Sequence, residues 1–334
     1  MDTSGSIWIS TSGGAAWSIT SAPSLGYRAI ASDSTGQYLA AGEFSRTGRI
    51  FLSSSGGNDW TKSAAPSNLW ISIVSDATGR YLGACTYDPY GPGYIYTSSS
   101  WGQSWSLTSA PQVPYNQMAS DSSGQYLVAV TSYDEKGIWI SSSFGESWTK
   151  TTAPDYLNWV DITSSSSGQY LAATVSPSSG KIWISTSGLL LSLPYLLLAL
   201  LSLLIFLGGA VWSQTSSLVA SWGRITSDST GQYLAAINND DGGSIWISTS
   251  GGSSWSKTSA PTATYSAIRS SYTGSLLVAT SFNNGIYTSL QQSFPTSAPS
   301  STHVPTSAPS YVAGSPTPEP SSVPTYVPGK PTPP

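Results

Sequence analysis

Short runs of Ile, Val, Trp, Tyr and Thr, four to six residues long, alternate with Gly, Asp, Ser and Pro along most of the chain. Runs of this length and composition are typical of β-strands, and the residues between them are typical of turns. One combination recurs six times: an aromatic-led run, a polar turn that contains a glycine, and a run such as "QYLAA". In the first copy the turn and second run read "SDSTGQYLAA", residues 32–41.

The turn glycines set the period of the repeat. They are Gly36, Gly79, Gly124, Gly168, Gly231 and Gly274, so the separations are 43, 45, 44, 63 and 43 residues. After each second run come a "GxIWIS"-type run and then a Trp-led polar run such as "WTKS". Four short antiparallel strands at a period near 43 residues are typical of a β-propeller blade. We therefore predict an all-β propeller with four-stranded blades over residues 1–290.

The strand inventory leaves the number of blades open between six and seven. It holds six first strands, six second strands, seven third strands and six fourth strands, and the chain opens on a third strand and closes on "GIYTS", residues 285–289. Ring closure removes exposed sheet edges, often with strands from both termini in one blade. We expect six blades, with the Trp17 strand completing the last; the alternative is a seven-bladed ring that lacks part of one blade. Because Met1 falls inside a repeat, we expect the natural protein to begin further upstream.

A second motif joins each third strand to its fourth strand. It reads "STSGGAAW" at residues 10–17, and later "SSSGGNDW", "SSSWGQSW", "SSSFGESW" and "STSGGSSW". The motif resembles the Asp-box, or bacterial neuraminidase repeat (BNR), S-x-D-x-G-x-x-W, of sialidases, photosystem assembly factors and sortilin-like receptors. Serine stands at the Asp position, as Ser12, Ser55, Ser100, Ser143, Ser187 and Ser250. A serine hydroxyl can close such a turn on a backbone amide. The resemblance implies the propeller fold, with this turn on the face opposite the usual ligand site.

The one long interval contains an apolar insertion, Leu189 to Gly208. Removing its twenty residues returns the interval to 43 and joins "KIWISTSG" to "GAVWSQTSS", with Trp212 in register. About twenty apolar residues suffice to cross a bilayer core, but a single crossing would place strands of one blade on opposite sides of a membrane. We favour a translated intron; an apolar helical excursion and a true membrane anchor are the alternatives.

An aromatic residue stands nine positions before each turn glycine and opens the predicted innermost strand. We expect these six rings to form a collar at the mouth of the central channel, where they could stack on sugar faces or on an extended polar chain. The predicted ligand-binding residues are Tyr27, Trp70, Tyr115, Trp159, Trp222 and Tyr265.

Composition excludes several classes of function. Only 8% of residues are charged, the formal net charge is -4, and no Lys/Arg cluster is present, which argues against a nucleic-acid partner. Cys85 is the single cysteine and His303 the single histidine, and His303 lies in a proline-rich tail. A His-based triad or a Cys/His metal site is therefore not available to the folded part. We expect no cofactor and no metal site.

Catalysis is the weaker expectation. The resemblance to sialidases implies three arginines for the substrate carboxylate, a Tyr/Glu nucleophile pair and an acid, and the sequence marks no such convergent set. A two-carboxylate glycosidase needs a facing Asp/Glu pair, for which Asp161 and Glu43 are the candidates. The other recurrent aspartates, Asp33, Asp76, Asp121 and Asp228, accompany the turn glycine and are interpreted as turn residues.

From residue 291 to residue 334 the chain consists largely of Pro, Ser and Thr. Such a segment cannot bury a core and is typical of disordered, O-glycosylated stalks of secreted and cell-wall proteins. We therefore expect a non-catalytic propeller at the cell surface or outside the cell that binds glycan or protein at its top face. The alternatives are a sialidase-like glycoside hydrolase and a propeller resembling the photosystem assembly factors.

Overall fold

The computed structural model of the protein describes residues 5–88, 90–131, 137–176, 180–186, 211–282 and 285–290, all within the unit Met1–Phe294. The apolar insertion 189–208 and the tail 291–334 lie outside the described residues. Within the described ranges, no helix has the length and apolar character needed to cross a membrane. The secondary structure there consists of short strands and a single 3-10 turn, η1 (Asp240–Gly242).

The strands repeat in the predicted order. First strands are β3 (Tyr27–Ser32), β7 (Trp70–Ser75), β11 (Tyr115–Ser120), β15 (Trp159–Ser164), β19 (Trp222–Ser227) and β23 (Tyr265–Ser270). Second strands are β4 (Leu39–Glu43), β8 (Leu82–Thr86), β12 (Leu127–Thr131), β16 (Leu171–Val175), β20 (Leu234–Asn238) and β24 (Leu276–Ser281). Third strands are β5 (Ile50–Ser53), β9 (Ile95–Ser98), β13 (Gly137–Ser141), β17 (Trp183–Ser185), β21 (Ser244–Ser248) and β25 (Gly285–Leu290). Fourth strands are β6 (Thr61–Lys62), β10 (Ser106–Leu107), β14 (Thr149–Lys150), β18 (Trp212–Gln214) and β22 (Ser256–Lys257).

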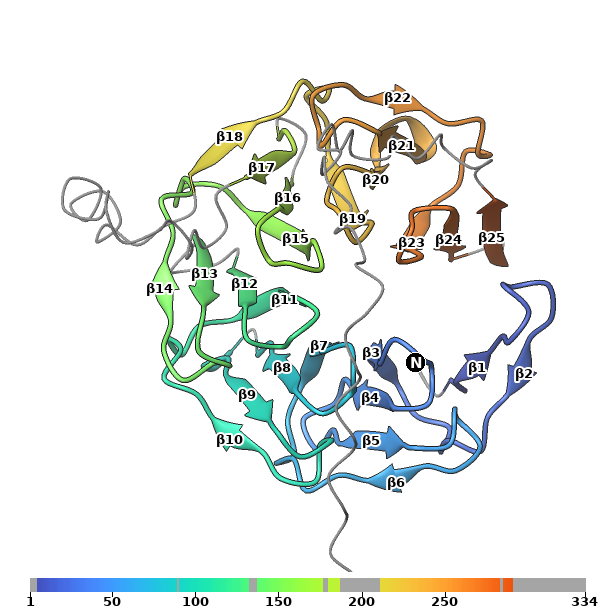
Figure 1. Ribbon diagram of the computed structural model, residues 1–334, viewed down its shortest axis with the longest axis vertical. Helices are drawn as coiled ribbons and strands as arrows, with labels where there is room; N and C mark the ends of the chain where they lie inside the picture. Colours follow the sequence, from blue (N-terminus) through green and yellow to red (C-terminus); the bar gives the residue numbers. More distant parts are fainter. Residues whose placement is uncertain are drawn as a thin grey trace, which may run out of the picture. The chain divides into compact units, whose positions relative to one another are not determined.

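These strands form six blades around a centre, which confirms the predicted propeller (Figure 1). Each blade is an antiparallel meander in which every strand pairs with the next in sequence, so no crossover connection is needed. Five blades have four described strands, and the sixth, β23-β24-β25, has three. The first strands lie innermost, each beside the first strand of the next blade from β3 through to β23.

The Trp17 strand does not complete the sixth blade. Residues Ser18–Ile19 form β2, which pairs with β1 (Trp8–Ile9) in a separate two-stranded sheet. In Figure 1 this sheet lies between the first blade and the sixth. A third-strand run and the Trp-led run that follows it pair with each other in the first five blades, and the same pairing is found at the start of the chain.

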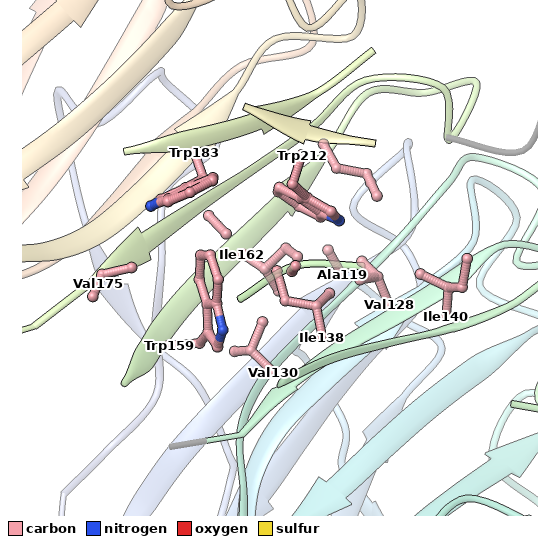
Figure 2. Close-up of a cluster of buried hydrophobic side chains, with 13 residues drawn as sticks. Ala119, Val128, Val130, Ile138, Ile140, Trp159, Ile162, Val175, Trp183 and Trp212 are labelled. Atoms are coloured by element: carbon pink, nitrogen blue, oxygen red, sulfur yellow. The ribbon is translucent and has the colours of Figure 1, made fainter. Parts of the chain in front are cut away.

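In the second, fourth and fifth blades, the tryptophan that opens the first strand contacts one aromatic ring of the third strand and the tryptophan at the start of the fourth. In the fourth blade, the Trp159 ring lies 6.0 Å from that of Trp183 and 6.1 Å from that of Trp212. Figure 2 shows these rings against Val130 and Ile138 of the preceding blade, in one buried cluster. Apolar burial between blades is thus the main stabilising interaction of the ring.

The turn between first and second strands is closed by its aspartate, as predicted. The Oδ1 atom of Asp33 accepts a hydrogen bond from the Tyr38 amide at 2.9 Å, and Asp76, Asp121 and Asp228 repeat this bond. Burial alone would raise the pKa of Asp33, but hydrogen bonds from Thr35, Tyr38 and Gln37 outweigh it and lower that pKa below its ordinary value. The ionised carboxylate is therefore the form that holds the turn.

The turn between third and fourth strands is closed by two serines. In the fifth blade the Ser248 hydroxyl accepts a hydrogen bond from Gly252 N at 2.9 Å, and the Ser250 hydroxyl accepts one from Ser254 N at 3.0 Å. The second serine stands where the Asp-box has its aspartate, so a hydroxyl makes the bond that we expected of it. Ser187, the corresponding serine of the fourth blade, lies outside the described residues.

The strands on both sides of the apolar insertion keep the standard pairing. Trp183 pairs with Gln214 and Ile184 with Ser213, just as Trp139 pairs with Lys150 and Ile140 with Thr149 in the third blade. In both blades, the partner of the third-strand tryptophan lies two residues after the tryptophan that leads the fourth strand. The partner of the following isoleucine lies one residue after that leading tryptophan. The insertion therefore interrupts the chain between these strands without shifting their register.

Candidate functional site

The six predicted collar residues open the six first strands, but their rings are not at an open mouth. Trp70, Tyr115, Trp159 and Trp222 have no exposed surface, Tyr265 is 5% exposed, and Tyr27 is partly buried. Two of these rings are also fixed by hydrogen bonds: the indole N–H groups of Trp159 and Trp222 donate to backbone carbonyls of the preceding loops at 3.1 Å. The buried rings therefore pack within the fold, and their faces are not available for stacking on a ligand.

The structure places the two candidate catalytic carboxylates in different surroundings, on the fourth and the first blade. Asp161 is 1% exposed, and its two oxygens accept the amides of Ile162 and Ile225, both at 2.9 Å. Glu43 accepts a hydrogen bond from Ser45 at 3.0 Å and lies at the end of β4. Asp161 thus joins its blade to the next one, and its hydrogen-bonding capacity is used within the fold.

The central channel forms a cavity of about 640 Å³ between the first strands, lined by backbone and by small polar and apolar side chains. At the start of the first strands, Arg28 and Arg224 come within electrostatic range of each other, although they belong to the first and fifth blades. Burial, and then the charge of Arg224, lower the pKa of Arg28. Its guanidinium lies 5.0 Å from the centroid of the Phe44 ring. This end of the channel is therefore cationic, as far as the described residues show.

A separate pocket of about 260 Å³ lies between the first and second blades, on the face that carries the turns after the first and third strands. We call this face the turn face. Tyr38 and Trp101 form its aromatic wall, with ring centroids 6.4 Å apart and planes inclined at 38°. The apolar part of its lining comes from Leu39, Leu52 and Leu82. The polar part comes from Ser53, Ser54, Thr61 and Gln103.

Trp101 adopts a backbone conformation that disfavours its own side chain. Its φ of 53° is in the left-handed region, where the equivalent residues Gly13, Gly56 and Gly251 have values of 58–64°. For a bulky L-residue this conformation costs about 1–2 kcal/mol. The ring is 43% exposed, and the Arg80 guanidinium lies 5.6 Å from its centroid. An exposed aromatic in a strained position is the kind of feature that marks a functional site.

The third blade provides an internal comparison. Phe144 occupies the Trp101 position with a φ of 54°, but its ring lies only 4.7 Å from the Tyr81 ring. The space at that blade interface is about 10 Å³. The larger separation of Tyr38 and Trp101 is thus associated with an open pocket, whereas the closer stacking of Tyr81 and Phe144 fills the corresponding space.

Sequence analysis did not identify this pocket. The signal was present: in "SSSWGQSW" and "SSSFGESW" an aromatic residue replaces the first glycine of "STSGGAAW" and "STSGGSSW". The replacement identifies Trp101 and Phe144 as aromatic residues at turn positions where the left-handed backbone conformation favours glycine. The partner of Trp101, Tyr38, is 63 residues away and belongs to another blade, so only the structure joins them.

No protein-family model matches the sequence, and no curated protein matches it either. Solved structures do resemble the fold. A GH74 enzyme of Niastella koreensis superposes with a TM-score of 0.58 at 15% identity, covering 86% of this chain and 53% of that one. YCF48 bound to a D1 peptide gives a TM-score of 0.63 at 14% identity, covering 87% and 88%. The β-propeller domain of Cps50 (Swd1) of Myceliophteria thermophila gives 0.61 at 15%, covering 87% and 92%.

This chain spans about half the length of the GH74 structures, one of which is described as an ancestral enzyme. The matched propellers include enzymes and a protein bound to a peptide, so the shared architecture does not assign an activity. Identities of 14–15% show the fold alone. By its strand order and by these comparisons, the chain is a β-propeller.

Proposed function

We propose that this protein is a non-catalytic binding propeller that recognises a glycan in the pocket between Tyr38 and Trp101. The observation that carries the proposal is the strained, exposed Trp101 ring beside an open, partly polar pocket. Flat aromatic surfaces bind the apolar faces of sugar rings, and hydroxyl and amide groups at the rim pair with sugar hydroxyls. This places the proposed ligand on the turn face, in place of the top-face collar expected from the sequence.

The electrostatics of the pocket favour a neutral or weakly acidic sugar. Arg80 is the charged residue that lies against its aromatic wall, 5.6 Å from the Trp101 centroid and 5.3 Å from that of Tyr81. Its Nε already donates to the Ser99 carbonyl at 3.1 Å, which fixes the guanidinium beside the ring. The remaining guanidinium N–H groups would be available to a sugar hydroxyl or carboxylate.

We place the protein at the cell surface or outside the cell, on the Pro/Ser/Thr-rich segment 291–334. The composition of that segment supports this placement, because stalks of this kind present binding domains away from a surface. We also propose that the protein belongs to the Asp-box class of propellers, and the serine-closed turns support this assignment. The involvement of Asp161 in hydrogen bonds within the fold favours binding over glycoside hydrolysis.

A glycan-array screen of the full chain tests the proposed function. Trp101→Gly installs the residue found at the equivalent positions Gly56 and Gly251, so the turn can form without the ring. We expect the wild-type protein to bind one class of glycan and the Trp101→Gly variant to lose at least tenfold in affinity. Phe144→Gly is the matched control, because it makes the same change where the pocket is filled, and its affinity should stay within twofold of the wild type. Equal binding by wild type and Trp101→Gly, with native circular dichroism for both, would exclude this pocket.

A further inference from the structure

Two positions at which the second blade departs from the repeat meet at the pocket between Tyr38 and Trp101. One is Trp101 itself, where other turns have glycine. The other is Arg80, which follows the turn glycine and stands where other repeats have Gln37, Gln125, Gln169 and Gln232. The two residues are in direct contact, because the Trp101 amide donates to the Arg80 carbonyl at 3.0 Å and the guanidinium lies 5.6 Å from the centroid of the Trp101 ring. A positive charge and an aromatic ring have thus been added at one place.

The fold requires a hydrogen-bond donor at position 80, and a neutral amide meets that requirement. Arg80 Nε donates to the Ser99 carbonyl at 3.1 Å, and in the next blade Gln125 Nε2 donates to the equivalent Ser142 carbonyl at the same distance. The terminal Nη1 and Nη2 groups of Arg80 make no hydrogen bond within the described part of the chain. The positive charge of Arg80 and its terminal N–H donors are therefore not used by the turn.

No ion pair neutralises this charge among the residues that the structure describes. Arg80 is exposed, and the residues that line the pocket include no Asp or Glu. Asp33 and Asp76, in the turns on the two sides of the pocket, are buried and accept the amides of Tyr38 and Tyr81 at 2.9 and 3.0 Å. An exposed guanidinium that is held beside an uncharged pocket can pair with an anionic group of a ligand, and its planar fork matches a carboxylate.

The size of the pocket limits what can enter it. Its volume of about 260 Å³ is below the roughly 300–1,000 Å³ of pockets that hold drug-sized ligands, and it suits a single sugar ring. Leu39, Leu52 and Leu82 offer apolar contacts inside the pocket, whereas Arg80 lies at its edge, next to the lining residue Gly79. A sugar in the pocket therefore reaches the guanidinium through a charged group that is attached to the ring itself.

We infer that Arg80 determines the specificity of this pocket and that the sugar it selects is a hexuronic acid, whose ring carries a carboxylate. This inference rests on the proposed glycan-binding function and narrows its ligand to the acidic class. The ring lies in the pocket against Tyr38 and Trp101, and its carboxylate accepts hydrogen bonds from the terminal N–H groups of Arg80. Either esterification of the carboxylate or loss of the guanidinium removes this pairing and leaves the other contacts of the ring in place.

Pairs of probes that differ only in charge test this selection. They are disaccharides that end in glucuronic, galacturonic or mannuronic acid, each with its uncharged methyl ester, titrated calorimetrically into the full-length protein. We expect at least one free acid to bind the wild type about fivefold more tightly than its ester, which is what an exposed ion pair can contribute. Because salt screens exposed charges, this preference should shrink as the NaCl concentration rises.

The repeat itself supplies the variant. Arg80→Gln installs the residue found at Gln125, whose amide makes the bond that Arg80 makes to Ser99, so the turn should be retained. This variant should bind each acid and its ester within about twofold of each other, since the ion pair is removed. Arg46→Gln is the matched control, because it removes the same charge from an exposed loop at the opposite ends of the strands, and it should keep the preference for the acid.

Three results would overturn the inference: no binding of any free acid, equal binding of acid and ester by the wild type, or a preference for the acid that survives in Arg80→Gln. Titration of Trp101→Gly with the same probes and with neutral disaccharides separates this failure from that of the proposed function. If the wild type binds neutral sugars and Trp101→Gly does not, the pocket binds glycan and only the selection by Arg80 is wrong. If Trp101→Gly binds every probe as the wild type does, both the pocket and the selection are wrong.

Discussion

Asp161 and Ile225 join two blades through a single hydrogen bond of 2.9 Å, from the Ile225 amide to the Asp161 carboxylate. The other oxygen of the same carboxylate accepts the amide of Ile162 in its own strand. Because the side chain is 1% exposed, water does not replace either bond readily. Removing the carboxylate would leave two buried amide donors without an acceptor.

We therefore expect Asp161→Ala to lower the free energy of unfolding by about 2–4 kcal/mol, since each bond to a charged group contributes about 1.5–3 kcal/mol and orphaned donors add a penalty. Asp161→Asn should be less harmful, because its carbonyl oxygen still accepts one amide. Urea denaturation measures both changes. An Asp161→Ala protein as stable as the wild type would contradict the structural role and reopen the catalytic interpretation of this carboxylate.

The turn between the third and fourth strands of the fifth blade can be used to test the role of the serine that stands at the Asp-box aspartate position. Ser250→Ala removes the acceptor for the Ser254 amide and should lower stability by about 1 kcal/mol, as for other side-chain caps of backbone amides. Ser250→Asp should retain that bond and match or exceed the wild type, because a charged acceptor bonds more strongly. Thermal melting of the wild type and the two variants gives their order of stability. A lower melting temperature for Ser250→Asp than for Ser250→Ala would contradict the proposed role of this side chain as an acceptor.

Substitutions at Trp101 should reverse the usual order of alanine and glycine. Trp101→Ala keeps the left-handed strain and loses the contacts with Tyr38 and Arg80, so it should be destabilising by about 1 kcal/mol. Trp101→Gly loses the same contacts but relieves the strain, which offsets the loss. Chemical denaturation should therefore find the glycine variant more stable than the alanine variant. Ser99 is a neighbouring position with φ outside this region, and there alanine should be the more stable of the two.

Tyr27 should contribute to the loss of stability in alkali. Burial, and to a lesser extent the Glu43 carboxylate, raise the pKa of Tyr27 from 10.0 to about 12. The unfolded chain thus releases this proton at lower pH than the folded protein does, so the stabilisation is present below pH 10 and is lost as the pH rises toward 12. Tyr27→Phe should show a smaller loss of stability over that interval.

The same variant has a second readout at neutral pH. The Tyr27 hydroxyl is buried and has no hydrogen-bond partner among the described residues. Its removal should leave stability unchanged or raise it by up to about 1 kcal/mol. Denaturation curves at pH 7 and pH 11 separate the two effects. Identical alkaline losses in the wild type and in Tyr27→Phe would show that other groups dominate.

Deletion of Leu189 to Gly208 should leave the propeller folded. The flanking strands β17 and β18 pair in the register of an uninterrupted blade, and the deletion restores a turn of the length found in the other blades. We expect the thermal midpoint to stay within a few degrees of that of the full chain. A deletion variant without native circular dichroism would show that the insertion is needed for the fold. Sequencing of the mature transcript then decides whether the segment is translated intron.

The strand boundaries could be predicted because they are local properties of the sequence. All six first strands begin at the aromatic residue that the repeat marks, from Tyr27 to Tyr265. The direction of those rings could not be predicted in the same way. A β-bulge follows the aromatic residue in every first strand, for example between Trp159 and Asp161. A bulge breaks the two-residue alternation of faces, so periodicity no longer distinguishes the channel from the blade interface.

Among the described residues, only the two-stranded sheet β1-β2 lies between the first blade and the sixth, and this affects how the described ring should respond to unfolding. In a closed propeller every blade has two neighbours, and none is a natural starting point for loss of structure. In the part of the chain that the structure describes, the first and sixth blades meet only the small sheet β1-β2 on one side, so the array has two ends and its stability approaches a sum over nearest-neighbour blade pairs. Hydrogen exchange should accordingly be fastest in β3–β6 and β23–β25 and slowest in β11–β14, opposite the sheet β1-β2.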